Sequence, residues 1–469
     1  MRWSGVILVA LVAGGCASAP SHPPLEVGLG QVAITPPVGY RLAGYFYERL
    51  STGVHDPLFA RAIVFRQGDE RFALVECDLC QTSADVVARA RAMAESRTGI
   101  PADHIAICST HTHTGPDYFG ALAEHLHRIA LHDHAGVDPA RTVDYPTMLG
   151  DRIVQAIITA SASVQPAELA AGDTAQPNVA FNRRYVMIDG TVAWNPGKLN
   201  PKIARPAGPI DPRVDILRVT RSGGATAAVL TRFPLHPDTA GGTEYSADFP
   251  HYIEETVRSR LGTNVASIFA QGTSGNVNHV DVSNDSPQKG PDESARIGRL
   301  LGNAVCDALP TLSRVTRPTL AIATKTVHLP LQHFSSDEIA KARQAFEKIQ
   351  ERKLPFLVGV RATKIMRIEE RHGGPIAAQV QAVRLGDDTA IVLLPSELFV
   401  EFGLAIKARS PFPHTIVIEL ANDSFGYVPT RKAFDEGAYE PTNATIEPGG
   451  GERLVEAAVG LLGRLKEMR

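Results

Sequence analysis

Two histidines follow an apolar run at a spacing of two residues, in the segment Cys108-Ser109-Thr110-His111-Thr112-His113-Thr114-Gly115-Pro116-Asp117. The preceding residues, 105–109, have the pattern of a buried strand, and side chains alternate across a strand. His111 and His113 are therefore expected on the same side of it, with the Gly-Pro pair ending the strand. Two imidazoles on one face supply part of the ligand set of a catalytic zinc ion.

The H-x-H spacing is weak evidence by itself, because the chain repeats it at His125/His127 and at His132/His134. These four histidines lie in segment 124–138, whose polar composition predicts an irregular insertion with solvated imidazoles. The segment follows His113 closely, so it is interpreted either as a lid over a cleft or as a surface loop.

Further candidate ligands lie where other predicted strands end, since a catalytic zinc takes His and carboxylate ligands from distant segments. His236 follows the apolar run 227–235, and Glu397 follows the run 390–396. For each of them alone, a polar residue at a strand end that faces water is the favoured interpretation. Tyr427, after the turn at 422–424, is also compatible with a core position.

Cys77 and Cys80 form a C-x-x-C pair at the end of another predicted strand. Because no second pair accompanies them, two buried thiols are the favoured interpretation over a redox or structural zinc site. Asp78 is expected to act as a hydrogen-bond partner behind the metal ligands.

Apolar periodicity predicts the elements that must position these residues. Strands are predicted at 62–65, 72–76, 105–109, 214–219, 225–233, 265–270, 321–329, 377–385, 390–394 and 415–420. Helices are predicted at 84–96, 252–261, 294–309, 336–352 and 452–466. The alternation of strands and helices predicts an α/β fold, with one or more mixed central β-sheets flanked by helices.

The composition is that of a soluble globular chain, with 469 residues, 44% hydrophobic and 21% charged. Lys and Arg number 47 against 50 Asp and Glu, so the formal charge is −3 and no basic block is present. This excludes a nucleic-acid surface built on phosphate neutralisation. No protein partner is implied.

The N-terminus has the pattern of an export signal. Arg2 supplies a positive charge, and residues 6–12 form an apolar stretch too short to span a bilayer. The sequence Ala13-Gly14-Gly15-Cys16 resembles a bacterial lipobox, so 1–16 is interpreted as a lipoprotein signal peptide and 17–24 as a tether; the alternative is plain cleavage near 17–19. An exported protein is expected, held to the membrane through lipidated Cys16, as an outer-membrane lipoprotein or in the periplasm.

From about Val27 onward the chain resembles the N-terminal catalytic domain of the neutral/alkaline non-lysosomal ceramidases. The motifs that carry the resemblance are Val27-Gly28 with Ile34-Thr35-Pro36-Pro37, Leu42-Ala43-Gly44-Tyr45, the segment 53–62, Thr110 to Pro116, and Gly426-Tyr427-Val428-Pro429-Thr430 with Tyr439-Glu440. The resemblance implies a ceramidase N-terminal-domain-like fold over 25–469 as a single zinc hydrolase domain, without the C-terminal immunoglobulin-like domain of the classical enzymes.

The resemblance also implies roles for individual residues. Zinc would be held by four residues: His111, His236, Glu397 and Tyr427. The implied catalytic and substrate-binding residues are His113 as general base and acid, Tyr439 and Arg183 at the oxyanion, and Asn278. Arg184 is the alternative to Arg183, because the two arginines are adjacent.

Two departures from the family pattern bear on the substrate. Ceramidases carry a serine where Ser274-Gly275-Asn276-Val277-Asn278-His279 places Asn278, and an amide cannot form an acyl-enzyme. A route through zinc-activated water remains unless Ser274 reaches the site. The stretch 238–242 also differs from the ceramidases, which tend to carry Ser-Met and asparagines there.

The sequence therefore predicts a zinc-dependent amidohydrolase of the N-acylsphingosine deacylase type, with ceramide or a related N-acyl lipid as the first candidate substrate. The alternatives are a zinc amidase or esterase acting on a non-sphingolipid acyl compound, and a non-catalytic metal- or ligand-binding lipoprotein. A long apolar groove leading to His111 would favour a lipid substrate, whereas a polar pocket would favour the first alternative.

Overall fold

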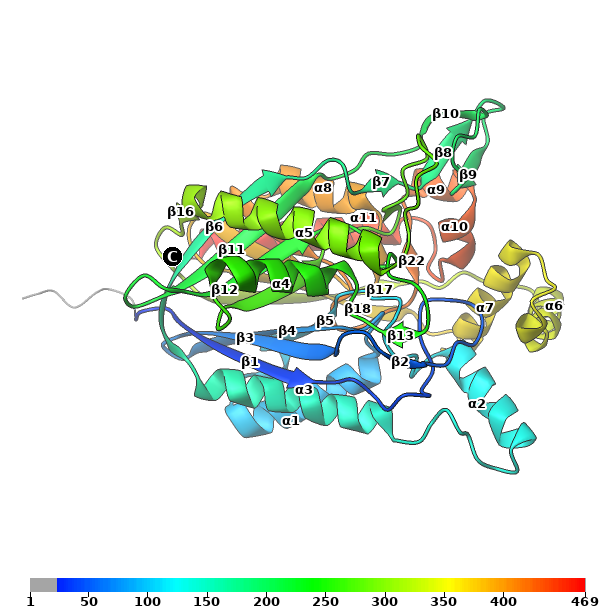
Figure 1. The fold of residues 1–469 in the computed structure, drawn as a ribbon, viewed down its shortest axis with the longest axis horizontal. Coiled ribbons are helices and arrows are strands. Elements are labelled where there is room, and N and C mark those ends of the chain that lie inside the picture. The colour runs from blue at the N-terminus through cyan, green and yellow to red at the C-terminus, as the bar shows by residue number, and fades with distance from the viewer. Residues whose placement is uncertain (1–22, 469) are drawn as a thin grey trace, which may run out of the picture.

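Two β-sheets pack face to face in the middle of this computed structural model, and helices cover both outer faces (Figure 1). The structure describes residues 23–468, so the predicted leader with Cys16 and most of the predicted tether lie outside the described residues. The larger sheet has nine strands: β1 (Glu26–Ala33), β3 (Phe59–Gln67), β4 (Glu70–Cys77), β5 (Ile105–Ser109), β6 (Gln165–Ala175), β11 (Arg213–Arg221), β12 (Thr226–Phe233), β14 (Ala266–Gln271) and β16 (Ser313–Arg314). The smaller sheet has four: β17 (Ala321–Leu329), β18 (Ile376–Arg384), β19 (Thr389–Leu393) and β21 (His414–Ile418).

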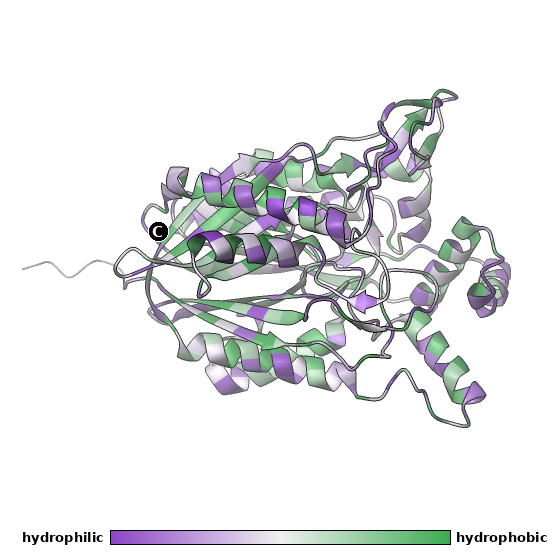
Figure 2. Cartoon of the chain, in the orientation of Figure 1, coloured by the Kyte–Doolittle hydropathy of each residue, from purple (hydrophilic) through white to green (hydrophobic). Residues whose placement is uncertain are grey.

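The apolar side chains between the two sheets form one continuous core. It combines residues such as Phe65, Leu217 and Ile268 from the larger sheet with Ile391 and Ile416 from the smaller one. The outer faces are also apolar and are covered by helices, which Figure 2 shows as hydrophobic on one side and hydrophilic on the other. Four layers result: helices, sheet, sheet, helices.

The helices divide among three outer surfaces. α1 (Ala84–Thr98) and α3 (Tyr145–Ala162) cover the β1–β5 half of the larger sheet, whereas α4 (Phe249–Leu261) and α5 (Pro291–Ala308) cover its β11–β14 half. α8 (Val400–Arg409) and α11 (Gly450–Glu467) cover the smaller sheet. Gly28 in β1 allows α3 to pack closely against the sheet, because a Cβ at this position would lie 1.9 Å from the Ala160 carbonyl oxygen.

Three neighbouring strand pairs in the two sheets are parallel: β4 with β5, β12 with β14, and β19 with β21. The segments after their carboxyl ends carry most of the candidate residues: His111, His236, Asn278, Glu397 and Tyr427. The carboxyl ends of parallel strands are the usual place for a site in open α/β sheets.

Short elements gather at this end of the molecule (Figure 1). They include the pairs β2 (Gly53–Val54) with β13 (Glu244–Tyr245), β7 (Phe181–Asn182) with β15 (Val277–Asn278), and β20 (Glu397–Leu398) with β22 (Tyr427–Val428), and the sheet of β8 (Arg184–Met187), β9 (Val192–Trp194) and β10 (Ile203–Pro206). The helices here are α2 (Ala121–Asp133), α6 (Ser336–Glu347), α7 (Phe356–Glu370), α9 (Arg431–Glu436) and α10 (Tyr439–Asn443). Of the helices in the described range 23–468, none is both long enough and apolar enough to cross a membrane.

The predicted fold class is confirmed, and the predicted strands agree with observed ones to within two or three residues at either end. The irregular insertion predicted at 124–138 is wrong, because α2 occupies 121–133. Ala121, His125 and Ala130 lie on its buried side. The segment is therefore an amphipathic helix, which its many polar residues made hard to recognise from the sequence. The helix predicted at 336–352 is also too long, since α6 ends at Glu347 and a 3₁₀ turn follows at Ile349–Glu351.

Candidate metal centre

Three buried side chains from three different segments converge at the carboxyl ends of the parallel strands. His111 follows β5, His236 follows β12, and Glu397 begins β20 after β19. Glu397 Oε2 lies 3.3 Å from His111 Nε2 and 3.5 Å from His236 Nε2. The ligand atoms of the three residues all lie within 4.8 Å of one another, as atoms sharing one metal ion would.

The remaining polar atoms of the three side chains are held from behind. His111 Nδ1 donates to the Cys80 carbonyl oxygen at 2.8 Å, and His236 Nδ1 lies 3.4 Å from Ser274 Oγ. Both contacts favour the tautomer with the proton on Nδ1, which leaves the Nε2 lone pair free for a metal. Glu397 Oε1 accepts from Gln81 Nε2 at 2.8 Å.

The atoms that face each other have no hydrogen-bond partner: His111 Nε2, His236 Nε2 and Glu397 Oε2 are all buried and unpaired. Buried polar atoms are normally paired, so three orphaned ones pointing at one another fit a bound cation. Burial alone would raise the pKa of Glu397, but the two imidazoles hold it well below its usual range. Two imidazoles and a carboxylate are the donor set of a catalytic zinc site.

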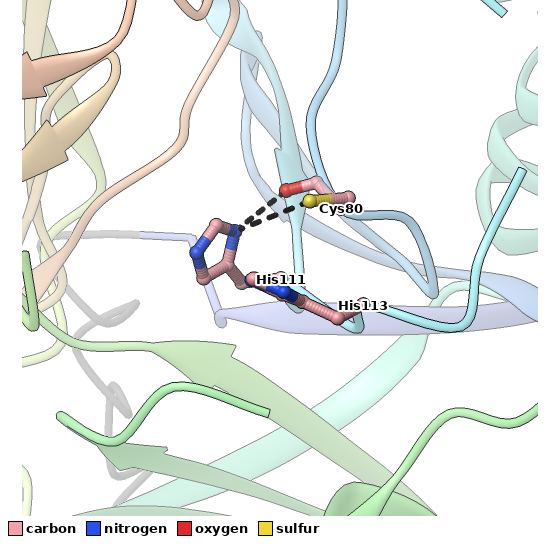
Figure 3. A group of neighbouring side chains, drawn as sticks. All are labelled: Cys80, His111 and His113. Carbon is pink, nitrogen blue, oxygen red and sulfur yellow. Dashed lines mark hydrogen bonds between the residues drawn. The ribbon is translucent and has the colours of Figure 1, made fainter. Parts of the chain in front are cut away.

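A second possible trio, Cys80, His111 and His113, fits a metal less well (Figure 3). The Cys80 thiol faces His111 Nδ1 at 3.9 Å, but this nitrogen already donates to the Cys80 carbonyl oxygen. Burial raises the pKa of the Cys80 thiol, which disfavours the thiolate that a metal requires. The trio with Glu397 is the better candidate.

Tyr427 lies beside Glu397, because the two residues are register partners in the parallel pair β20–β22. Its ring stacks on that of His236, with ring centroids 6.4 Å apart. The Tyr427 side chain is buried. It is therefore both a core residue, as the sequence allowed, and a neighbour of the candidate ligands.

His113 lies next to the trio, with its ring centroid 5.0 Å from that of His111 and 5.8 Å from that of His236. Strand alternation is not the cause, since β5 ends at Ser109 and His111 has a φ of 72°. The His113 amide donates to the Pro237 carbonyl, and burial lowers the pKa of the imidazole to about 4. Gly44, with a φ of 95°, packs against this ring. A Cβ added to Gly44 would lie only 2.6 Å from His113 Cγ, so a larger residue does not fit there.

Arg183 and Arg184 point to different surroundings. The Arg183 guanidinium lies over the rings of Tyr427 and Tyr439 at 5.3 and 5.7 Å, and donates to Glu440 and to the Gly275 carbonyl. Arg184 binds the other carboxylate oxygen of Glu440 and also pairs with Glu436. Arg183 is therefore the arginine beside the tyrosines.

Two cavities meet at the candidate centre. The larger, of about 460 Å³, is lined by His111, His113, Glu397, Tyr427 and Tyr439 among others. The smaller, of about 270 Å³, is lined by His236, Arg183 and Asn278, together with Trp194 and Asn195. Asn278 therefore lines the smaller cavity, where its amide donates to Asn195 Oδ1 at 3.1 Å.

Ser274 is a partner of His236 and is enclosed by protein. Its Oγ donates to Glu419 Oε1 at 2.8 Å and accepts from Gln271 Nε2 at 2.7 Å. Glu419 is fully buried and also accepts from the Leu398 amide. Sequence reasoning missed Glu419, although it directly follows the apolar run that forms β21 and so carried the same strand-end signal as His236.

Other predicted residues lie outside the centre. Asp78 binds Arg61 and the Phe59 amide, so the prediction that it supports the metal ligands is wrong. Cys77 and Cys80 are free, buried thiols, as the favoured interpretation expected. Residues two apart on a helix do not share a face, and α2 separates the His125 and His127 side chains accordingly.

The four insertion histidines also differ in exposure. His125 is buried against Phe346, so the prediction of a solvated imidazole is wrong there, while the His132 side chain is 89% exposed. His127 lies 2.7 Å from Asp138 Oδ2.

Comparison with protein families places this geometry in context. Residues 25–246 match the model of the family described as neutral/alkaline non-lysosomal ceramidase, N-terminal. The resemblance to this ceramidase family is confirmed. The matched region includes His111, His113, Arg183 and His236, whereas Glu397 and both tyrosines lie beyond it.

Solved ceramidase structures share the fold. The neutral ceramidase from Pseudomonas aeruginosa superposes with a TM-score of 0.69 at 20% identity, covering 95% of this chain and 75% of that chain. A structure described as a ceramidase complexed with C2 gives the same TM-score and identity, covering 95% and 76%. Comparison with curated protein sequences gives no significant match.

Proposed function

We propose that this chain is a zinc-dependent hydrolase that cleaves an N-acyl amide bond, with ceramide or a related N-acyl lipid as the first candidate substrate. The observation that carries the proposal is the convergence of three buried, unpaired ligand atoms from His111, His236 and Glu397. The match of residues 25–246 to the ceramidase family supports the reaction class.

The donor set fits zinc, with Tyr427 beside the three other residues as the fourth ligand. Bound there, zinc would supply a Lewis acid for the amide carbonyl and lower the pKa of a water molecule to about 7. The chain's own residues then account for positioning and proton movement.

His113 is the group that moves the proton. Its two ring nitrogens are buried and unpaired, and the ring lines the larger cavity beside the candidate ligand His111. The neutral imidazole accepts a proton from the attacking water and returns it to the leaving nitrogen. Asp238 Oδ1 lies 3.8 Å from His113 Nδ1.

Arg183 and Tyr439 stabilise the oxygen on which negative charge develops. Arg183 stays charged because Glu440 pairs with it, and the Tyr439 ring lies 5.3 Å from that of Tyr427, centroid to centroid. Donors fixed by packing stabilise such charge without reorganising during the reaction. Ser274 is disfavoured as a nucleophile, because its hydroxyl is engaged by Glu419 and Gln271.

A second candidate function is favoured by one specific observation. The larger cavity has a mixed lining, with aromatic residues such as Phe46 and Phe119 but also several charged side chains: Asp85, Asp117, Arg367, Glu370 and Arg371. These residues do not form a long apolar groove. The lining therefore favours an amide or ester with a polar acyl part over a long-chain sphingolipid.

The experiment that tests the proposal is a substrate panel. Purified protein of measured zinc content is incubated with a short-chain fluorescent ceramide, other N-acyl amides and esters, each with and without a chelator. Chelator-sensitive release of fatty acid from the ceramide supports the first candidate, and cleavage elsewhere in the panel supports the second. Stoichiometric zinc without any turnover would contradict both and favour a binding protein.

We also propose that the chain is exported and lipidated at Cys16, as its leader sequence indicates. Mass spectrometry of the N-terminal peptide tests this, with a diacylglycerol-modified Cys16 as the expected result. An unmodified terminus near residues 17–19 would indicate ordinary signal cleavage instead.

A further inference from the structure

Three consecutive apolar side chains are exposed in the first turn of α7. Phe356, Leu357 and Val358 are 47%, 43% and 44% exposed. Elsewhere in the described part of the chain, exposed large hydrophobic residues occur singly. Single exposed residues need no explanation, whereas a contiguous apolar patch marks an interaction surface.

The buried clusters that hold α7 do not include Leu357 or Val358. The helix is held by Val360, Ala362 and Ile365, which are buried in two apolar clusters. Burial in these clusters therefore does not account for the two side chains, which stay 43% and 44% exposed.

The exposed turn is continuous with the larger cavity. The Phe356 ring stacks on Tyr439 with centroids 5.5 Å apart, and it meets Phe46 edge-on at 5.9 Å. Both of these partners line the cavity. The Phe356 ring thus connects the first turn of α7 to two aromatic residues of the cavity wall.

Basic residues flank the apolar turn. Lys348, Arg352 and Lys353 are exposed just before it, and the acidic residues in the same stretch are Glu347 and Glu351, the latter 3.5 Å from Lys353 Nζ. The first turn of α7 itself carries no acidic residue. This local excess of positive charge contrasts with the formal charge of −3 on the whole chain.

We propose that residues 348–358 form a docking segment for a lipid bilayer with anionic headgroups. Phe356, Leu357 and Val358 enter the boundary between headgroups and acyl chains. The basic side chains of residues 348–353 contact the headgroup phosphates. Each basic residue near an anionic surface adds to the attraction, which salt screens. The proposal concerns association with lipid and stands whether or not the chain hydrolyses an amide.

The docking segment is separate from the predicted lipid attachment. α6 and α7 lie at one end of the molecule, whereas β1, the first strand, begins at the opposite end (Figure 1). Docking is therefore testable on protein that carries no lipid. The chain from Ala17 onward is suitable, because the described fold begins after it, at residue 23.

The test is sedimentation with vesicles of phosphatidylcholine containing phosphatidylglycerol, compared with pure phosphatidylcholine. The variant is Leu357→Glu with Val358→Glu, which leaves Phe356 and its aromatic contacts in place. The matched control is Leu300→Glu with Met468→Glu, since both side chains are also exposed, at 38% and 52%, and lie outside the docking segment. Unfolding temperatures of the three proteins verify that each is folded.

The parent and the control are expected to bind the anionic vesicles equally, and the docking variant at least about tenfold more weakly. Binding is expected to weaken at high salt and on pure phosphatidylcholine. Equal binding of all three proteins, or no binding by the parent, would overturn the proposal. Concentration-dependent self-association lost only in the docking variant, with no vesicle binding, would also overturn it and identify an interface between copies. Because the vesicles contain no amide substrate, the result is independent of the proposed hydrolysis.

Discussion

Glu397 and Tyr427 face each other as register partners in the parallel pair β20–β22, although thirty positions separate them in the chain. Each follows a strand of the smaller sheet, β19 and β21, which are themselves parallel neighbours. The pairing continues beyond the sheet and delivers a carboxylate and a phenol to the histidines that follow β5 and β12. The candidate centre therefore depends on both sheets being packed together.

The two histidines of the Thr-His-Thr-His segment are predicted to separate metal binding from turnover. His111→Ala removes an unpaired ligand atom, so both zinc content and activity should fall. His113→Ala should keep the metal and lower kcat by about 10²–10⁴-fold, because only proton transfer is lost. Metal analysis after dialysis, together with amide hydrolysis, measures both effects. Full activity in either variant would contradict the assignment.

Ser274 is predicted to tune the affinity of His236 for metal. Ser274→Ala removes the contact behind His236 Nδ1 and one hydrogen bond to Glu419, which should weaken zinc binding by about 10- to 100-fold. Competition with a chromogenic chelator measures this affinity without any substrate. Ser267→Ala is the matched control, since Ser267 is a buried serine on the strand that precedes Ser274. Identical zinc affinities in the two variants would contradict a role for Ser274 in positioning His236.

Gly44 is predicted to be required for the position of His113. A Cβ on Gly44 would lie 2.6 Å from the imidazole, so Gly44→Ala should displace the ring and lower kcat by about 100-fold while zinc stays bound. Gly39→Ala is the control, because Gly39 has nearly the same φ, 97°, but nothing lies within 4 Å of its added Cβ. Backbone strain alone would affect both variants equally, and that outcome would contradict the steric explanation.

Asp138 is predicted to stabilise the fold above about pH 4. Burial alone would raise the pKa of Asp138, but hydrogen bonds from Arg41, His127 and the Ala140 amide lower it to about 2. Because the folded pKa lies below the unfolded one, this stabilisation is present at neutral pH and is lost as the pH falls toward 2. Asp138→Asn should lower the free energy of unfolding by about 2 kcal/mol at pH 7. Denaturant unfolding should show this difference shrinking between pH 4 and pH 2, and a constant difference would argue against the ion pair.

The elements of the two sheets were largely predictable from sequence, because buried strands are continuous apolar runs such as 390–394. α2 was not, since its buried face uses His125 and alanines instead of large apolar residues. α7 was also not predicted. Its first turn carries Phe356, Leu357 and Val358, which are exposed.

Strand ends indicated His111, His236 and Glu397 as separate candidates, but only the family resemblance combined them into one site, because such distant residues meet only through strand pairing. The supporting contacts were beyond prediction for the same reason. The Cys80 carbonyl, Ser274 and Glu419 acquire their roles from neighbours on other strands.

The central claim is that a metal held by His111, His236 and Glu397 is required for amide hydrolysis. The most direct measurement is titration of metal-free protein with zinc while hydrolysis of the best panel substrate is followed. Activity should rise in proportion to bound zinc and reach its maximum at one zinc per chain. Hydrolysis by the metal-free protein, or zinc binding at that stoichiometry without hydrolysis, would contradict the claim.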